Sequence, residues 1–150
     1  MNAPISVYGS SGFLGSRFCE MYPNTTIQIP REQNFPNSSD VLYFISTVHN
    51  YNIFTEPHKD IDTNLNKLIS VLEECRKINN NTTFNFISSW FVYGMNSTLD
   101  TKETDICDPR GFYSITKRAA EQMLICNCNT FGINYRIMRM TNIIGSRTLS

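Results

Sequence analysis

The order of short apolar segments and longer segments of helical periodicity is the feature that most constrains the fold of this chain. Each apolar segment is short and bounded by turn-forming residues, which is typical of strands buried inside a sheet. The last of them contains two arginines but keeps its apolar residues between and beside them. The predicted strands are Ile5–Tyr8, Thr26–Ile29, Val41–Ile45, Phe84–Ile87 and Tyr135–Met140.

Helical periodicity between the predicted strands indicates helices over Phe13–Tyr22, Ile61–Ile78 and Phe112–Phe131, the last followed by Gly132 as a C-cap. Strands that alternate with helices predict an α/β fold, a Rossmann-like parallel sheet of about five strands with helices on both faces. Residues 1–150 form one domain in this interpretation. The second helix carries an apolar stripe of Ile61, Leu65, Leu68, Leu72 and Cys75, and the third a stripe of Ile115, Ala119, Met123 and Cys126.

The composition excludes several classes of protein. With 150 residues, 41% of them apolar, the chain is long enough to fold without a metal or a disulfide. Thirteen basic and thirteen acidic residues give no net charge, so a nucleic-acid partner is not expected. No apolar run is long enough to span a bilayer and the start lacks a signal peptide, so we expect a cytoplasmic protein without membrane contact.

Cysteine and histidine residues form no metal-binding pattern. The five cysteines are unevenly spaced, and Cys126-x-Cys128 is too close for a zinc or redox motif. We interpret the cysteines as reduced thiols that fill space in the structure. His49 and His58 are assigned no catalytic role, and no metal is expected.

A glycine-rich segment follows the first predicted strand and opens the first predicted helix. Gly9 allows a tight turn, Gly12 lets the backbone approach a pyrophosphate, and Gly15 lets helix and strand pack closely. The N–H groups of the helix N-terminus would also face that anion. A tight strand–helix turn without a ligand is the alternative. The candidate cofactor-binding residues in this segment are Gly9, Ser11, Gly12, Phe13, Leu14 and Gly15.

The end of the second predicted strand bears on the choice of dinucleotide. A carboxylate at this point accepts a hydrogen bond from the ribose 2′-hydroxyl of NAD, whereas an arginine favours the 2′-phosphate of NADP. The strand ends in Ile29-Pro30-Arg31-Glu32, with proline at the position of the acid. We therefore predict NADP as the preferred cofactor through Arg31, with NAD as the alternative because Glu32 can still serve.

Tyr113 and Lys117 are four residues apart and therefore lie on one face of the third predicted helix. A nearby cation stabilises a phenolate and lowers the pKa of a phenol, as a general acid–base at neutral pH requires. Lys117 can also donate a hydrogen bond to the nicotinamide ribose. Taken alone, this common spacing also fits an ordinary surface helix.

Two serines, Ser88 and Ser89, follow the fourth predicted strand at the carboxyl edge, where open α/β sheets bind their ligands. Ser89 can donate a hydrogen bond to a substrate oxygen as an alcohol and a ketone interconvert. Taken alone, the pair also fits a plain serine turn.

Together, the three motifs resemble the extended short-chain dehydrogenase/reductase family, in particular its NAD-dependent epimerase/dehydratase group. The resemblance runs from Ile5 to Gly145 and rests on Gly9-x-x-Gly12-x-x-Gly15, Ser88-Ser89-x-x-Val92-Tyr93-Gly94 and Tyr113-x-x-x-Lys117. It implies that Ser89, Tyr113 and Lys117 are catalytic and that Tyr113 and Lys117 also contact the cofactor. It further implies cofactor contacts for Ser46, Thr47 and Asn64, and substrate contacts for Ser89, Trp90 and Asn142.

The chain departs from the family pattern in three places. Only about ten residues separate Ile29 from Val41, where the family has a further helix and strand, so we expect the sheet order 2-1-3-4-5. Trp90 and Phe91 stand where the family's dehydratases have an Asp-Glu pair, which disfavours dehydration. The sequence stops at Ser150, so the substrate-binding C-terminal domain is expected to be absent or truncated.

The resemblance therefore implies an enzyme, an NAD(P)-dependent nucleotide-sugar epimerase or keto-sugar reductase. The alternative is a non-catalytic dinucleotide-binding module, a redox sensor or subunit that lacks its substrate domain. The expected partners are a nucleotide-activated sugar and a second copy of the chain. The homodimer would form through the helices near 61–78 and 110–131, unless their apolar stripes cover only the sheet.

Overall fold

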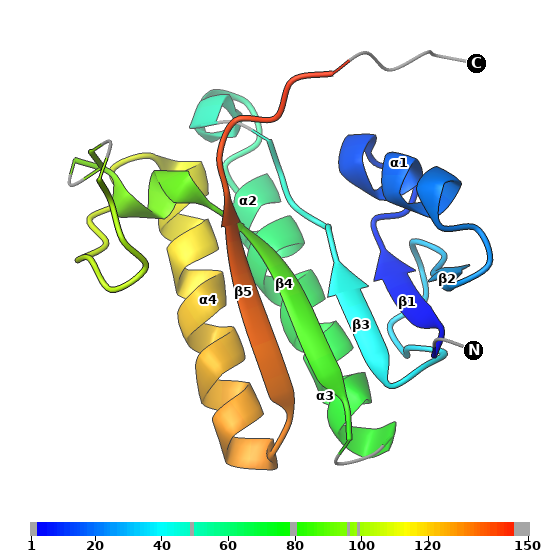
Figure 1. Ribbon diagram of the computed structural model, residues 1–150. Helices are drawn as coiled ribbons and strands as arrows, with labels where there is room; N and C mark the ends of the chain where they lie inside the picture. The colour runs from blue at the N-terminus through cyan, green and yellow to red at the C-terminus, as the bar shows by residue number, and fades with distance from the viewer. Residues whose placement is uncertain (1–2, 49, 79–80, 96, 99, 146–150) are drawn as a thin grey trace.

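The sheet is built from parallel strands in the order β2-β1-β3-β4-β5 (Figure 1). It belongs to a computed structural model that describes residues 3–48, 50–78, 81–95, 97–98 and 100–145. This arrangement confirms the predicted fold class and the predicted strand order. The strands are β1 (Ile5–Tyr8), β2 (Thr26–Gln28), β3 (Asp40–Tyr43), β4 (Thr83–Ser89) and β5 (Asn134–Met140).

The short connection between β2 and β3 accounts for the strand order. Residues 29–39 contain turns and bends but no helix or strand. The chain returns from β2 to the other side of β1, where Ile5 lies opposite both Thr26 of β2 and Asp40 of β3. β2 and β3 therefore lie on either side of β1.

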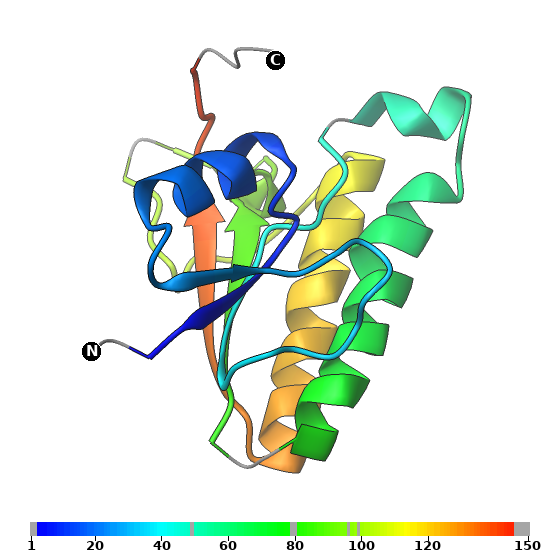
Figure 2. The same cartoon turned by 90° about the vertical axis from the view of Figure 1, so that its right-hand side faces the viewer.

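Helices cover both faces of the sheet, as the sequence predicts (Figure 2). One face carries α1 (Phe13–Met21), and the other carries α3 (Lys67–Ile78) and α4 (Phe112–Phe131). A short α2 (Lys59–Ile61) and a π-helical turn (Asp62–Asn66) lead directly into α3. Short 3-10 helices follow two of the strands, at Asn50–Phe54 after β3 and at Trp90–Tyr93 after β4.

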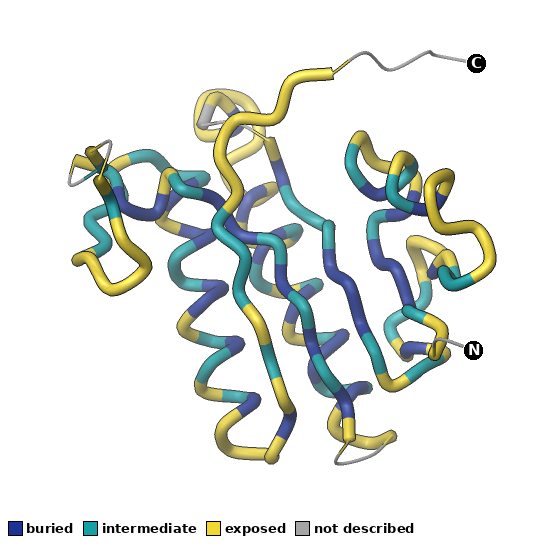
Figure 3. Tube along the Cα trace, viewed as in Figure 1, coloured by how far each residue is buried: buried dark blue, intermediate teal, exposed yellow. Residues whose placement is uncertain are grey.

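The hydrophobic core lies between the sheet and the pair α3 and α4 (Figure 3). Aromatic residues of neighbouring strands form its sheet side, with Tyr43 centred 5.6 Å from the ring of Phe84 and 5.8 Å from that of Tyr8. Leu72 and Leu124 close the core from the two helices. Burial of this apolar area is the main stabilising contribution in a sheet covered by helices.

The apolar stripe predicted for α4 is on the wrong face. Ile115 and Cys126 of that stripe are exposed, and the face that packs on the sheet holds Ala120, Leu124 and Cys128. The buried face also contains Lys117 and Glu121, so a count of apolar residues underestimates it. The stripe predicted for α3 is largely confirmed, because Leu68, Leu72 and Cys75 are buried while Ile61 is exposed.

Strand limits differ slightly from the predictions, with a consequence for the carboxyl edge. β3 ends at Tyr43 rather than Ile45, whereas β4 extends to Ser89, which lies opposite Met140 of β5. Ser46 and Thr47, which follow β3, and Ser89, the last residue of β4, therefore line one cavity at the carboxyl edge. The loops after β1, β3, β4 and β5 meet at this edge, near the N-terminus of α1 (Figure 1). Among the described helices, none has both the length and the apolar character required to cross a membrane.

Candidate functional site

A groove runs along the carboxyl edge of β1, β3 and β4. It consists of two adjoining cavities of about 420 and 360 Å³. The cavities share Gly9, Gly12, Phe44 and Ser46, so a single extended ligand can occupy both. We call them the ribose cavity, which lies beside the end of β2, and the reaction cavity, which lies beside the end of β4.

The turn between β1 and α1 separates the two cavities and can be formed only by small residues. Gly9 has φ of +75°, and a Cβ on Gly15 would lie 2.2 Å from the carbonyl oxygen of Gly9. A Cβ on Gly12 would lie 3.1 Å from the same oxygen, and Gly12 is also the N-cap of α1. The backbone can therefore approach a ligand closely at the positive end of a helix dipole. These residues fit the pyrophosphate of a dinucleotide.

The ribose cavity contains the residues predicted to choose the cofactor. Pro30, Arg31 and Glu32 line it together with Ser11 of the glycine turn. The first residue of α3, Lys67, also lines the cavity, and the sequence analysis did not identify it. The wall of the ribose cavity is therefore formed by α3 as well as by the end of β2.

The reaction cavity brings together most of the remaining predicted site residues. Ser89 ends β4, Tyr113 and Lys117 come from the first turns of α4, and Asn142 follows β5. These four positions are far apart in the sequence, and only the parallel crossovers bring them to one edge. The other predicted residues that line this cavity are Gly9, Gly12, Phe13, Leu14, Gly15, Ser46 and Thr47.

The two serines at the end of β4 have different partners. Ser88 donates a hydrogen bond of 2.6 Å to Glu121 in the buried interior. Within the described part of the chain, Ser89 only accepts a bond of 3.3 Å from the backbone N–H of Phe91, an N-cap interaction for the following 3-10 helix. The hydroxyl hydrogen of Ser89 therefore remains available for a substrate oxygen, whereas that of Ser88 does not.

Lys117 is fully buried although its ammonium group carries the chemistry expected of the site. Its Nζ donates a 2.7 Å hydrogen bond to the carbonyl oxygen of Ile87 and lies 4.2 Å from the ring centre of Phe86. Burial lowers the pKa of Lys117 to about 7, although the negative charge of Glu121 acts against this shift. The ammonium is therefore close to its protonation midpoint at neutral pH.

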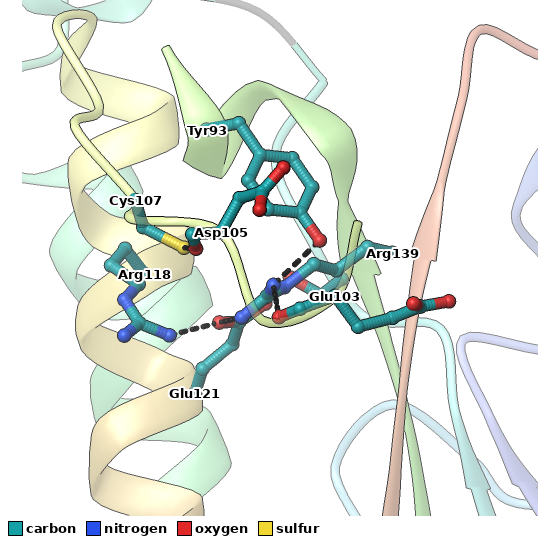
Figure 4. A network of polar contacts seen from close by, with 8 residues as sticks. Tyr93, Glu103, Asp105, Cys107, Arg118, Glu121 and Arg139 are labelled. Atoms are coloured by element: carbon teal, nitrogen blue, oxygen red, sulfur yellow. Dashed lines mark hydrogen bonds and ion pairs between the residues drawn. The ribbon is translucent and has the colours of Figure 1, made fainter. Parts of the chain in front are cut away.

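An arginine–glutamate cluster joins α4 to β4, to β5 and to the 3-10 helix after β4 (Figure 4). Arg139 donates to Glu121 through Nε at 3.0 Å and Nη2 at 2.9 Å, and Arg118 donates to the same carboxylate at 2.7 Å. Arg139 also donates to the hydroxyl of Tyr93 at 2.7 Å. Burial opposes ionisation of Glu121, but the bonds from Arg139, Ser88 and Arg118 outweigh burial and lower the pKa of its carboxyl.

Asn64 lies beneath the reaction cavity rather than on its surface. Its amide nitrogen donates to the hydroxyl oxygens of Thr47 at 2.9 Å and Thr116 at 3.0 Å, and its oxygen accepts from the N–H of Thr47 at 3.0 Å. Thr47 also donates to the buried Asp60. Asn64 sits in the π-helical turn, a distortion that is frequent at functional sites. It therefore joins the loop after β3 to the first turn of α4.

Trp90 does not line the groove. It faces a separate cavity of about 640 Å³ beside β5, which is also lined by Tyr93, Arg139 and Thr141. Its indole nitrogen is buried and has no hydrogen-bond partner within the described part of the chain. The predicted substrate contact of Trp90 would therefore involve a neighbouring hollow rather than the groove itself.

Sequence reasoning missed Lys67, Glu121 and Asp60. Glu121 lies four residues after Lys117, so helical spacing places it on the same face and provided a usable signal. No comparable signal exists for Lys67 or Asp60, because their partners are distant in the sequence.

A parallel sheet of this order, with a glycine turn at the first strand–helix junction and a groove along the carboxyl edge, defines a dinucleotide-binding α/β domain. The sequence model of the NAD dependent epimerase/dehydratase family matches residues 39–149. The chain belongs to this family.

Relatives with assigned names are nucleotide-sugar epimerases. A protein of Methanocaldococcus jannaschii, provisionally named a UDP-glucose 4-epimerase, is 27% identical over 114 residues, which are 76% of this chain and 37% of that protein. UDP-glucuronate 4-epimerase 4 of Arabidopsis thaliana is 27% identical over 90 residues, 59% of this chain and 21% of that protein. The chain thus spans well under half the length of these relatives.

Solved structures show the same fold at low sequence identity. RMD from Pseudomonas aeruginosa complexed with NADPH superposes with a TM-score of 0.82 at 23% identity, over 94% of this chain and 54% of that one. UDP-glucuronic acid 4-epimerase from Bacillus cereus in complex with NAD superposes with a TM-score of 0.83 at 19% identity, over 97% of this chain and 58% of that one. This chain therefore has the fold of roughly half of each neighbour.

Proposed function

We propose that this chain is the cofactor-binding half of an NAD(P)-dependent nucleotide-sugar epimerase or keto-sugar reductase. The observation that carries the proposal is the convergence of Ser89, Tyr113 and Lys117 on the reaction cavity, which adjoins the glycine turn. The names of the curated relatives, UDP-glucose and UDP-glucuronate 4-epimerases, support a nucleotide-activated sugar as substrate. The neighbours solved with NAD and NADPH support a dinucleotide cofactor.

A bound nicotinamide would supply a reversible acceptor for the hydrogen on the sugar carbon. Tyr113 would take the proton from the sugar hydroxyl during oxidation and return it during reduction. Ser89 would donate a hydrogen bond to the same oxygen as it changes between hydroxyl and carbonyl. The ammonium of Lys117, on the same helix face, would stabilise the phenolate form of Tyr113.

Epimerisation and reduction both fit these groups better than dehydration does. Dehydration needs an acid to protonate a leaving hydroxyl, and the residues after Ser89 are Trp90 and Phe91. Neither side chain can exchange a proton with a sugar. In epimerisation, the keto sugar would turn over and accept hydrogen on its opposite face. Asn142 would contact the phosphates of the nucleotide sugar from the second side of the cavity.

We propose NADP as the preferred cofactor and NAD as the alternative. Arg31 lines the ribose cavity, where a guanidinium suits the 2′-phosphate of NADP. Glu32 lines the same cavity and suits the 2′-hydroxyl of NAD. Titration calorimetry of the chain with NADP⁺ and NAD⁺ tests both statements. Saturable binding of one dinucleotide per chain supports the proposed function, and binding of neither overturns it.

Replacing Tyr113 with phenylalanine separates the enzyme from the alternative, a non-catalytic module. In the enzyme, Tyr113→Phe should lower the rate of nicotinamide reduction by UDP-glucose or UDP-glucuronate about a hundredfold, because the proton acceptor is lost. The affinity for the dinucleotide should stay within about twofold of wild type. The control is Tyr22→Phe at the exposed end of α1. Dinucleotide binding without any transfer, in wild type and variant alike, would favour the module.

A further inference from the structure

The loop of residues 30–38 begins at the ribose cavity, which its first three residues line, and hydrogen bonds hold it in place. The hydroxyl of Tyr8 on β1 donates a 2.7 Å hydrogen bond to the carbonyl oxygen of Asn34. Near the far end of the loop, Ser38 lies 2.8 Å from Ser6, and Ser6 also accepts from the N–H of Asn37 at 2.9 Å. The loop thus has one defined arrangement although it contains no helix or strand.

Lys67, at the start of α3, ties the cavity side of this loop to the helix layer. Its Nζ donates to the carbonyl oxygen of Arg31 at 2.8 Å and to Oδ1 of Asn34 at 2.6 Å. A third, longer bond of 3.5 Å reaches the carbonyl oxygen of Gln33. An ammonium has three hydrogens to donate, so these three acceptors use its full capacity. Lys67 therefore acts on a ligand through the loop rather than by direct contact.

The three hydrogen bonds from Lys67 to the loop, which we call the tether, hold the backbone of Arg31 in place. The side chain of Arg31 is the one expected to contact the ribose of the cofactor. Arg31 and Glu32 are neighbours on the loop, carry opposite charges, and line one cavity. The guanidinium suits a phosphate and the carboxylate suits a hydroxyl. Arg31 and Glu32 are the two central residues of a turn closed by a 3.1 Å hydrogen bond from the N–H of Gln33 to the carbonyl oxygen of Pro30. Rotation of the peptide group that joins them changes which of the two side chains faces the ligand.

We propose that Lys67 is a positioning residue for cofactor choice, which holds the Arg31 backbone so that the loop favours the 2′-phosphate of NADP over the 2′-hydroxyl of NAD. The proposal rests on the proposed function, since it requires a dinucleotide in the groove. The proposal gives Lys67 of α3 a role in the choice between NADP and NAD, in addition to the residues at the end of β2.

Titration calorimetry with NADP⁺ and NAD⁺ on wild type and Lys67→Met tests this role. Methionine keeps the length and apolar stem of lysine but removes the three donors. We expect the affinity for NADP⁺ to fall about tenfold and the affinity for NAD⁺ to fall less than about threefold. The preference for NADP⁺ over NAD⁺ would then become smaller. If Lys67 had only a structural role, Lys67→Met would weaken the binding of both cofactors equally and leave the ratio of their dissociation constants unchanged.

Two further variants make the test specific. Asn34→Ala removes one acceptor of the tether but no charge. It should also reduce the preference for NADP⁺ over NAD⁺. This variant keeps the proposal testable if Lys67→Met does not fold. The matched control is Lys77→Met near the end of the same helix, where the lysine is exposed and pairs with Glu74. The control should leave both dissociation constants unchanged.

The outcomes separate this proposal from the proposed function. A wild-type chain that binds neither dinucleotide overturns the proposed function itself. A wild-type chain that binds a dinucleotide, but whose preference is for NAD⁺ or is unchanged by Lys67→Met and Asn34→Ala, overturns only the role of Lys67. The role of Lys67 is supported if the wild-type chain prefers NADP⁺ and if Lys67→Met and Asn34→Ala both reduce this preference.

Discussion

Lys117 and Glu121 show how partners decide the charge state of buried residues. Both side chains are almost completely buried on the same face of α4, one helical turn apart. Lys117 has a single carbonyl acceptor and an aromatic ring, so burial dominates and its pKa is lowered. Glu121 receives hydrogen bonds from two arginines and a serine, so its partners dominate and its pKa is lowered as well. The result is a firmly ionised carboxylate beside an ammonium that can titrate.

The lowered pKa of Lys117 predicts a dependence of stability on pH. An unfolded lysine titrates at about 10.4, so between about pH 7 and that value the unfolded chain binds a proton that the folded chain does not. The free energy of unfolding contributed by Lys117 therefore rises with pH across this interval. Urea denaturation at several pH values should show a more positive slope for wild type than for Lys117→Met.

The comparison with Lys117→Met is needed because other buried groups act in the opposite direction. Burial raises the pKa of the Cys75 and Cys128 thiols to about 12, so the unfolded chain loses these protons first as the pH rises. Their contribution is present in both proteins and cancels in the difference. Equal slopes for the two proteins would contradict the prediction.

At the scale of elements, the cluster around Glu121 joins α4 to the ends of β4 and β5. Ser88 reaches Glu121 from β4 and Arg139 reaches it from β5, while Arg139 also holds Tyr93 in the 3-10 helix after β4. Ser88 is the neighbour of Ser89 on β4, and Glu121 lies one helical turn after Lys117 on α4. The buried ion pair therefore helps to fix the placement of Ser89 relative to Tyr113 and Lys117.

Breaking the ion pair from the arginine side should destabilise the protein strongly. Arg139→Met leaves the fully buried carboxylate of Glu121 with only Arg118 and Ser88, and loss of one partner of a buried pair typically costs about 3–5 kcal/mol. Urea denaturation measures the loss. The double variant Glu121→Met/Arg139→Met should recover part of it, because no uncompensated charge remains. A single variant as stable as wild type would refute this view of the cluster.

At the scale of the whole molecule, α3 and α4 lie side by side on one face of the sheet (Figure 2), and each helix has an exposed isoleucine. Ile69 of α3 is 37% exposed and Ile115 of α4 is 46% exposed. The predicted stripe of α4 was expected to cover the sheet and also a partner, and it faces solvent at Ile115 and Cys126. This surface supports the expectation that two chains associate through these helices in a four-helix arrangement.

A charge placed on this surface should prevent association. Ile69→Glu and Ile115→Glu would each desolvate a carboxylate at the helix pair of the proposed homodimer, and each should weaken dimerisation at least about tenfold. Sedimentation equilibrium over a range of concentrations measures the change. Met21→Glu places the same charge on an exposed position of α1, on the opposite face, and should have no effect. A wild-type chain that stays monomeric would overturn the proposed homodimer.

The features predicted correctly from the sequence are those that local patterns encode. Alternating apolar segments and helical stretches predicted the fold class, and the strand order was predicted because residues 29–39 are too few for a further helix and strand. The glycine spacing determined the turn between β1 and α1, since φ at Gly9 and the space at Gly15 exclude larger residues. These properties depend only on neighbours along the chain.

Tertiary structure alone decided which polar residues are buried and what they hold. Glu121 and Arg139 are buried together, and Lys67 reaches the loop at Arg31 and Asn34, through contacts between residues 18 to 36 positions apart. A polar group can be buried only where its hydrogen-bonding partners are brought to it, and those partners come from other elements. Apolar periodicity therefore selected the wrong face of α4, whereas packing against β4 and β5 determined the correct one.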